Sequence, residues 1–318
     1  MTATALPELV TRFRHGERRA LARLLTLVEN ERPQGLDGMA QLYRDTGAAH
    51  VLGITGPPGA GKSTLTNALI RAYRAAGKRV GVLAVDPSSA LTGGATLGDR
   101  IRMLENYADD GVYIRSMATR GQLGGLSIAV GAATHILDAF GFDVICIETV
   151  GVGQDEVDIA DVADTVVLLQ VPGLGDSIQT IKAGILEIAD ILVVNKSDAK
   201  GAGELVRDLR NMLRLGERAE WVAPIVETTA IQSLGIDKLL TQIDRHRQHL
   251  ATSGEGQRRR EQRLRREVLR LARRQLGLRL DAVMGDEAFA DTLAELLRRE
   301  RDPLHVAGEL AERAARAD

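Results

Sequence analysis

The sequence predicts an α/β fold with a mainly parallel sheet and helical segments at both ends of the chain. Between about residues 50 and 230, short apolar runs alternate with longer stretches that have helical spacing. Many run positions are β-branched, and several runs are apolar on both faces, as in a parallel sheet that helices cover on both sides. The runs are residues 51–55, 80–85, 112–115, 144–147, 165–171, 191–195 and 222–226. We expect this sheet domain to span residues 48–250.

Residues 1–47 are expected to form an N-terminal helical segment. Leu6, Leu9, Val10 and Phe13 follow helix spacing, and a second set of apolar positions does the same before a proline-glycine break near residue 33.

Residues 251–318 are expected to form a C-terminal helical dimerisation arm. A glycine- and serine-containing linker leads into a stretch, residues 258–274, that holds nine arginines in seventeen residues. Leu264, Val268 and Leu271 recur at helix spacing, so this stretch has one apolar face and a basic back. Packing or dimerisation is the favoured interpretation, and a partner-docking surface is the alternative. Interleaved glutamates and the lack of aromatic residues there argue against nucleic-acid binding.

Composition excludes several classes of protein. With 41 basic and 43 acidic residues the net charge is -2, and aromatic residues make up 3%, so we expect no nucleic-acid partner. The one cysteine, Cys146, lies in an apolar run and is expected to be buried. No apolar stretch approaches the roughly 20 residues that span a bilayer, and the first ten residues do not resemble a secretory signal. We therefore expect a cytoplasmic protein with no membrane partner.

A glycine-rich loop follows the first apolar run and leads into a helical run. The loop consists of Gly56, Pro57, Pro58, Gly59, Ala60, Gly61, Lys62 and Ser63, followed by Thr64. Every position fits the phosphate-binding loop, whose backbone N–H groups and helix N-terminus surround a phosphate. We expect Lys62 to contact the β- and γ-phosphates and Ser63 to ligate Mg²⁺. A chance glycine-rich turn is the alternative, but the strand–loop–helix context favours a P-loop NTPase.

A second motif, Asn195-Lys196-Ser197-Asp198, ends a later apolar run and predicts guanine recognition. The Asp198 carboxylate would accept hydrogen bonds from guanine N1–H and the 2-amino group, which adenine does not offer. Asn195 is expected to brace neighbouring loops, and Lys196 to lie along the base. Thr229 and Ala230 stand where a Ser-Ala guanine loop is usual, so that loop departs from the usual pattern.

Acidic residues at the ends of other runs are candidates for the Mg²⁺ site. They are Glu148, Asp86 and Asp99, with a helix cap or a solvated loop residue as the alternative for each. Gln154 is the candidate for orienting the attacking water, and a surface amide is nearly as well supported. Because no arginine is evidently poised on the phosphates, we expect slow turnover without a partner.

Longer strings beyond these loops resemble one family. They read VDPSS at 85–89, RSMATRGQLGGL at 115–126, ETVGVGQ at 148–154, PGLGDSIQ at 172–179, IKAGILEIAD at 181–190 and DPL at 302–304. Together they resemble the MeaB/ArgK-type GTPases, accessory proteins of methylmalonyl-CoA mutase that belong to the SIMIBI class. The resemblance covers essentially the whole chain and is weakest at its ends.

The resemblance implies a homodimer that hydrolyses GTP to GDP. It also implies an adenosylcobalamin-dependent acyl-CoA mutase as partner, with the adenosyltransferase as a further one. The GTPase would gate loading of the cofactor and release of the inactivated cofactor, with no tightly bound cobalamin of its own. By matching motif positions, phosphate and Mg²⁺ roles fall to Lys62, Ser63, Asp86, Asp99 and Glu148.

The resemblance also points to a nucleotide-sensing switch. Its residues are Gly173, Gly175, Asp176, Gln179 and Lys182. Glycines give the backbone freedom, and the charged side chains can change partners when a γ-phosphate is lost. An ordinary glycine turn between a strand and a helix is the alternative.

Two other functions stay open at this point. One is a P-loop kinase of a lysine/arginine/ornithine transport system, and the other is a guanine-nucleotide-binding module with negligible turnover. The sequence offers no evident acceptor site for a kinase reaction.

Overall fold

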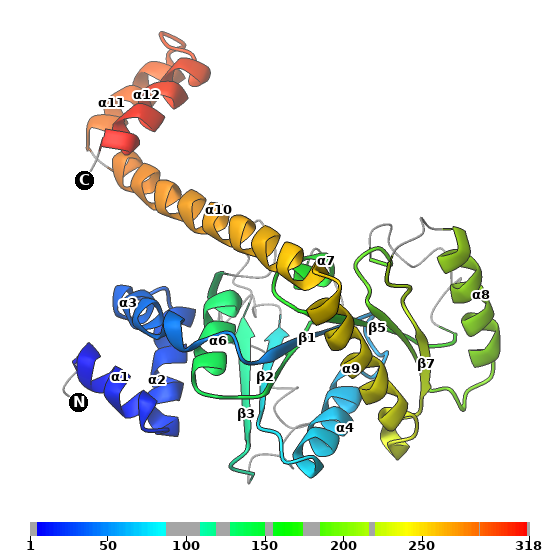
Figure 1. Cartoon of the computed structure of the whole chain (residues 1–318). Helices are drawn as coiled ribbons and strands as arrows, with labels where there is room; N and C mark the ends of the chain where they lie inside the picture. The colour runs from blue at the N-terminus through cyan, green and yellow to red at the C-terminus, as the bar shows by residue number, and fades with distance from the viewer. Residues whose placement is uncertain are drawn as a thin grey trace. The chain divides into compact units, whose positions relative to one another are not determined.

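A computed structural model describes residues 5–86, 109–118, 128–149, 155–173, 185–215, 220–285 and 287–316. The chain divides into two compact units, residues 1–258 and residues 259–318. The first holds the sheet and the second is helical (Figure 1). Among the described residues, no helix is both long enough and apolar enough to cross a membrane.

The sheet has seven strands, and every neighbouring pair is parallel, which confirms the predicted α/β class. The strands are β1 (His50–Thr55), β2 (Val80–Asp86), β3 (Val112–Ala118), β4 (Val144–Glu148), β5 (Thr165–Gln170), β6 (Ile191–Asn195) and β7 (Ile225–Thr228). Their spatial order is β3-β2-β4-β1-β5-β6-β7. The strands β1, β4 and β6 have no exposed residue, so both faces of the sheet are covered at these strands.

The last strand begins three residues later than its apolar run. Val222 is 68% exposed and Pro224 has no N–H to donate, whereas β7 starts at Ile225 and pairs with β6. The proline carbonyl still accepts a hydrogen bond from Leu192. Proline therefore marks the start of the strand.

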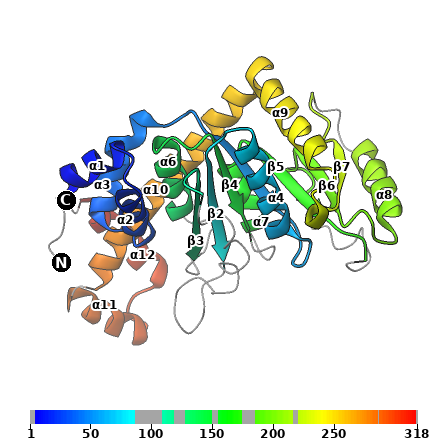
Figure 2. The same ribbon diagram turned by 90° about the horizontal axis from the view of Figure 1, so that it is seen from below.

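Helices cover both faces of the sheet (Figure 2). In the first unit they are α1 (Leu6–Arg14), α2 (Arg18–Glu29), α3 (Pro33–Leu42), α4 (Lys62–Ala75), α6 (Ile128–Ala139), α7 (Asp155–Asp158), α8 (Ala202–Leu215) and α9 (Ile236–Thr252). Helices α4 and α9 share one apolar core with the sheet, and α6 shares the other core with α1 and α2. A third cluster joins α8 to β6. Cys146 is fully buried, as expected, and burial raises the pKa of its thiol to about 12.

The N-terminal helices belong to the same compact unit as the sheet. Leu21, Leu24 and Leu25 of α2 are at most 1% exposed and lie in the core that contains α6. The rings of Phe13 and Phe140 meet edge to face with centroids 5.0 Å apart. Packing against α6 therefore fixes the position of α1 and α2, and burial of these side chains stabilises the unit.

The C-terminal region contains α10 (Glu255–Met284), α11 (Glu287–Leu297) and α12 (Pro303–Arg316). The DPL string starts the last helix: the Asp302 carboxylate accepts a hydrogen bond from the His305 backbone N–H at 2.9 Å, and Pro303 is the first helical residue. None of the described side chains of α10 is buried.

A chain of buried polar side chains lies at the amino edge of the sheet. The hydroxyl of Thr165 lies 2.9 Å from Nε2 of His50 and 2.7 Å from Nδ1 of His246. Nε2 of His246 lies 3.3 Å from an Asp190 carboxylate oxygen. One hydroxyl proton serves one ring, so the other ring must donate to the Thr165 oxygen. The side chains of His50, Thr165 and His246 therefore link β1, β5 and α9 at the amino ends of the strands.

Burial lowers the pKa of His50 from its ordinary 6.5 to about 4, although Asp164 acts in the opposite direction. As the pH falls below 6.5, the unfolded chain binds a proton at His50 that the folded chain does not. The free energy of unfolding must then decrease.

We expect His50→Gln, which keeps a polar atom near Thr165 but cannot titrate, to reduce this pH dependence. The loss of stability between pH 7 and pH 5 should be about 2 kcal/mol smaller in the variant than in the parent. Urea unfolding at the two pH values measures it, with exposed His15→Gln as the control. Equal losses in parent and His50→Gln would contradict the assignment.

Candidate nucleotide-binding site

The glycine-rich loop connects β1 to α4 at the carboxyl edge of the sheet, where α/β proteins bind ligands. Gly56 (φ 141°) and Gly61 (φ 90°) have backbone angles that other residues rarely adopt. A Cβ atom added to Gly56 would lie 2.4 Å from the carbonyl oxygen of Leu169. A Cβ atom added to Gly61 would lie 2.5 Å from the side-chain amide nitrogen of Asn195. The loop thus depends on glycine for close approach to the strands beside it.

Lys62 is the first residue of α4, and its side chain lies inside the loop. The buried ammonium donates hydrogen bonds to the carbonyl oxygens of Gly56 at 2.8 Å and Pro57 at 3.1 Å. The group therefore lies within the loop that the sequence assigns to the phosphates. Pro58, Gly59 and Thr64 are exposed around it.

Glu148, at the end of β4, lies against the first turn of α4. Ser63 donates a hydrogen bond to its Oε1 atom at 2.5 Å, and Thr66 donates one to Oε2 at 2.9 Å. The carboxylate is only 6% exposed. A hydroxyl and a carboxylate brought together beside a phosphate loop are the oxygen donors that Mg²⁺ prefers, so these residues fit that ion.

Asn195 joins the phosphate loop to the guanine loops. Its Nδ2 donates to the Ala60 carbonyl oxygen at 2.8 Å. Its Oδ1 accepts from the Thr228 hydroxyl and from the Ala230 backbone N–H, each at 3.1 Å. The backbone N–H of Ala230 therefore donates to the amide that braces the two loops.

Lys196 and Asp198 lie exposed at the same edge, beside the phosphate loop. Lys196 has a left-handed backbone (φ 54°) and donates from Nζ to the Gly59 carbonyl oxygen at 3.0 Å. The Thr229 hydroxyl donates to Asp198 Oδ1 at 3.3 Å and lies 3.1 Å from the Ser197 hydroxyl. Thr229 therefore holds the carboxylate by its side chain.

Other predicted site residues stand as follows. Asp86 is the last residue of β2, next to β4, and its side chain is not described. Gly173 lies in a turn shortly after β5 with φ 82°. The remaining candidates lie outside the described residues: Asp99, Gln154, Gly175, Asp176, Gln179 and Lys182.

Thr66 is a site residue that the sequence analysis missed. It lies three positions after Ser63, so both side chains are on one face of α4. The three-residue spacing from Ser63 could have indicated Thr66, but Thr66 lies beyond the last residue of the phosphate-loop motif.

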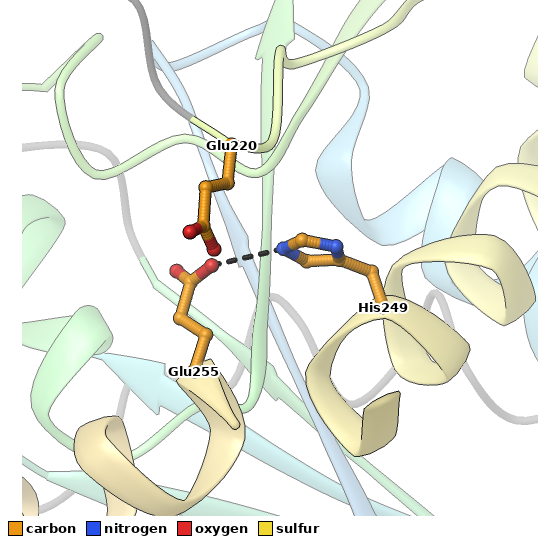
Figure 3. Close-up of side chains that lie close together, drawn as sticks. All are labelled: Glu220, His249 and Glu255. Carbon is orange, nitrogen blue, oxygen red and sulfur yellow. Dashed lines mark hydrogen bonds and ion pairs between the residues drawn. The ribbon is translucent and has the colours of Figure 1, made fainter. Parts of the chain in front are cut away.

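A separate group of metal-ligating side chains lies where α9 meets α10. Figure 3 shows Glu220, His249 and Glu255 pointing toward one another, with Nε2 of His249 2.9 Å from a Glu255 oxygen. A guanidinium nitrogen of Arg258 lies 3.8 Å from a carboxylate oxygen of Glu220, so a cationic side chain also belongs to this cluster. We interpret it as an ion-pair cluster that joins the two helices.

The family described as Methylmalonyl Co-A mutase-associated GTPase MeaB matches residues 21–284. A Pyrococcus horikoshii protein named as a GTPase is 48% identical over 306 residues, which cover 95% of this chain and 96% of the relative. The mitochondrial methylmalonic aciduria type A homolog of Mus musculus is 36% identical, covering 78% of this chain and 64% of the relative.

A solved structure described as a LAO/AO transport system kinase has the same fold. It aligns with a TM-score of 0.71 at 28% sequence identity, and 98% of each chain is covered. The family match, the phosphate loop and the guanine motif agree with one another. The chain is a GTPase and belongs to the MeaB family of methylmalonyl Co-A mutase-associated GTPases.

Proposed function

We propose that this GTPase is an accessory chaperone of an adenosylcobalamin-dependent acyl-CoA mutase, with methylmalonyl-CoA mutase as the first candidate. The family is described as mutase-associated, and the mouse relative is named for methylmalonic aciduria. The observation that carries the proposal is the meeting of the phosphate loop, Glu148 and the guanine motif at one edge of the sheet. In this function, GTP hydrolysis in the cytoplasm would gate cofactor loading and release of inactivated cofactor.

The residues at that edge divide the work of binding and hydrolysis. Backbone N–H groups of the loop would donate hydrogen bonds to the phosphates and the Lys62 ammonium would offset their charge, while Ser63 and Glu148 would hold Mg²⁺ or its water ligands. When bound, that ion neutralises charge that develops on the phosphate oxygens. We assign Asp86 and Asp99 to the surroundings of the ion and Gln154 to the attacking water, as the sequence suggests.

Guanine selection falls to Asp198. Its exposed carboxylate is held by Thr229, and the exposed Lys196 side chain would contact the base face. A carboxylate accepts two parallel hydrogen bonds from the guanine edge, whereas adenine would leave it facing an acceptor.

We propose that residues 173–182 act as the switch. Gly173, Gly175, Asp176, Gln179 and Lys182 would change partners when the γ-phosphate leaves, which transmits the nucleotide state to the mutase.

We also propose that residues 251–318 form a homodimerisation arm. Helix α10 is 30 residues long and has no buried side chain among those described, yet Leu269 and Leu276 lie seven positions apart on it and are 49% and 48% exposed. A second copy of the arm would cover these apolar side chains.

We expect Asp198→Asn to change the base preference from guanine to xanthine. The variant should bind GDP roughly 1,000-fold more weakly than the parent and gain affinity for xanthosine diphosphate, because the amide now donates where guanine also donates. Isothermal titration calorimetry measures both affinities, with exposed Asp237→Asn on α9 as the control. Unchanged GDP affinity in Asp198→Asn would refute the base contact.

We expect a cobalamin-dependent acyl-CoA mutase to stimulate GTP hydrolysis. Phosphate release should rise about tenfold or more when the mutase is added, because a bound partner can position groups that the free chain lacks. A coupled phosphate assay measures the rate, with an acyl-CoA enzyme that uses no cobalamin as the control.

The same assay with labelled GTP separates the alternatives. Transfer of the γ-phosphoryl group to an amino acid or a protein would indicate the transport-system kinase that the structural relative's name suggests. Binding of GTP without release of phosphate would indicate a passive module. A rate of phosphate release that does not change when the mutase is added would contradict the chaperone proposal.

We expect Leu276→Glu to weaken the dimer, because a charge replaces an apolar contact between arms. The dissociation constant should rise by roughly 100-fold. Sedimentation equilibrium measures it, with Gln275→Glu, at an exposed neighbouring position, as the control. A parent chain that is monomeric at all concentrations would contradict the arm's proposed role.

A further inference from the structure

Both oxygens of the Glu148 carboxylate are held by hydroxyl groups from one face of α4. Ser63 donates to Oε1 at 2.5 Å, and Thr66, one turn later, donates to Oε2 at 2.9 Å. Thr66 is fully buried and Glu148 is 6% exposed. Both side chains are shielded from solvent, so this pair of bonds contributes to the orientation of the carboxylate.

We propose that Thr66 is a positioning residue for GTP hydrolysis, which acts by fixing the orientation of Glu148 toward Ser63. The inference rests on the proposed role of Glu148 in the Mg²⁺ site. Within the described ranges, the hydroxyl of Thr66 has two hydrogen-bond partners, the Lys62 carbonyl oxygen and Glu148. Its effect on the reaction would therefore pass through Glu148.

Counting protons shows where the Thr66 hydroxyl is directed. The hydroxyl lies 3.0 Å from the Lys62 carbonyl oxygen and 2.9 Å from Glu148 Oε2, but it has one proton to donate. The Lys62 carbonyl is also the ordinary i−4 acceptor of the helix, so it does not need this donor. A hydrogen bond to a charged carboxylate is roughly twice as strong as one to a neutral carbonyl. The Thr66 hydroxyl therefore directs its proton mainly toward the Glu148 carboxylate.

The hydroxyl groups of Ser63 and Thr66 differ in their expected roles. Ser63 is at once the expected Mg²⁺ ligand and a donor to Glu148, whereas Thr66 holds only the carboxylate and the helix carbonyl. The last torsion of a glutamate is soft, so a carboxylate held at one oxygen can rotate. Loss of the Thr66 bond would remove the hydrogen bond that holds Oε2 and would loosen the orientation of the carboxylate. Groups that orient a metal-site carboxylate commonly change metal affinity or activity by about 10- to 100-fold.

The chain offers a matched control for this bond. Thr134 on α6 is also a buried helical threonine, and its hydroxyl donates at 2.8 Å to the carbonyl oxygen four residues earlier, at Val130. In the part of the chain that the structure describes, no carboxylate is hydrogen-bonded to the Thr134 hydroxyl. Thr134→Val therefore removes the same kind of helix bond as Thr66→Val and leaves Glu148 untouched.

The experiment compares Thr66→Val, Thr66→Ser and Thr134→Val with the parent chain. We would measure kcat and KM for GTP over a range of Mg²⁺ concentrations, GDP affinity without Mg²⁺, and the thermal midpoint. Thr66→Val should lower kcat by about 10- to 100-fold and raise the half-saturating Mg²⁺ concentration, with Mg²⁺-free GDP affinity within about threefold of the parent. Thr66→Ser should recover most of the rate, and Thr134→Val should match the parent.

Three outcomes would overturn the inference. Thr66→Val with the parent's Mg²⁺ response would show that the bond does not position Glu148. An equal loss in Thr66→Ser, or a parallel loss of Mg²⁺-free GDP binding, would assign Thr66 a packing role instead. If the parent itself hydrolysed no GTP, the proposed function would fail first. An active parent with an unaffected Thr66→Val removes this inference alone.

Discussion

The side-chain amide of Asn195 holds the two halves of the nucleotide site together. Its nitrogen contacts the phosphate loop and its oxygen contacts the loop after β7, and the residue is buried. Because each contact joins segments far apart in the chain, a single amide sets the distance between the place for the phosphates and the place for the base. Gly61 has no Cβ, which allows the amide to approach this closely. Contacts within the protein therefore set the spacing of the site.

Parallel strands explain why these groups meet. In such a sheet every carboxyl end lies at one edge, and β1, β4 and β6 end there with the phosphate loop, Glu148 and Asn195. The opposite edge carries the buried histidines and Asp190. One edge thus serves ligand chemistry, while the other ties β1, β5 and α9 together. This division places the chemistry away from the polar network at the amino ends of the strands.

Local patterns predicted the strands, the phosphate loop and the guanine motif, because each depends on residues close together in sequence. The error at β7 has a local cause too: Pro224 lacks the N–H that a strand needs, although apolar residues surround it. Thr66 was missed because its partner lies 82 residues away and only the fold brings them together. The contact between His50 and Thr165 spans 115 residues, and no short motif encodes it.

Cys146 has a practical consequence for study of the protein in solution. It is the one cysteine of the chain, it is fully buried in the central sheet, and burial raises the pKa of its thiol to about 12. Near neutral pH such a thiol is neither accessible nor ionised, so maleimide reagents should not react with it. A cysteine introduced at any exposed position would then be a unique attachment point for a fluorophore or spin label, with no need to remove the native residue.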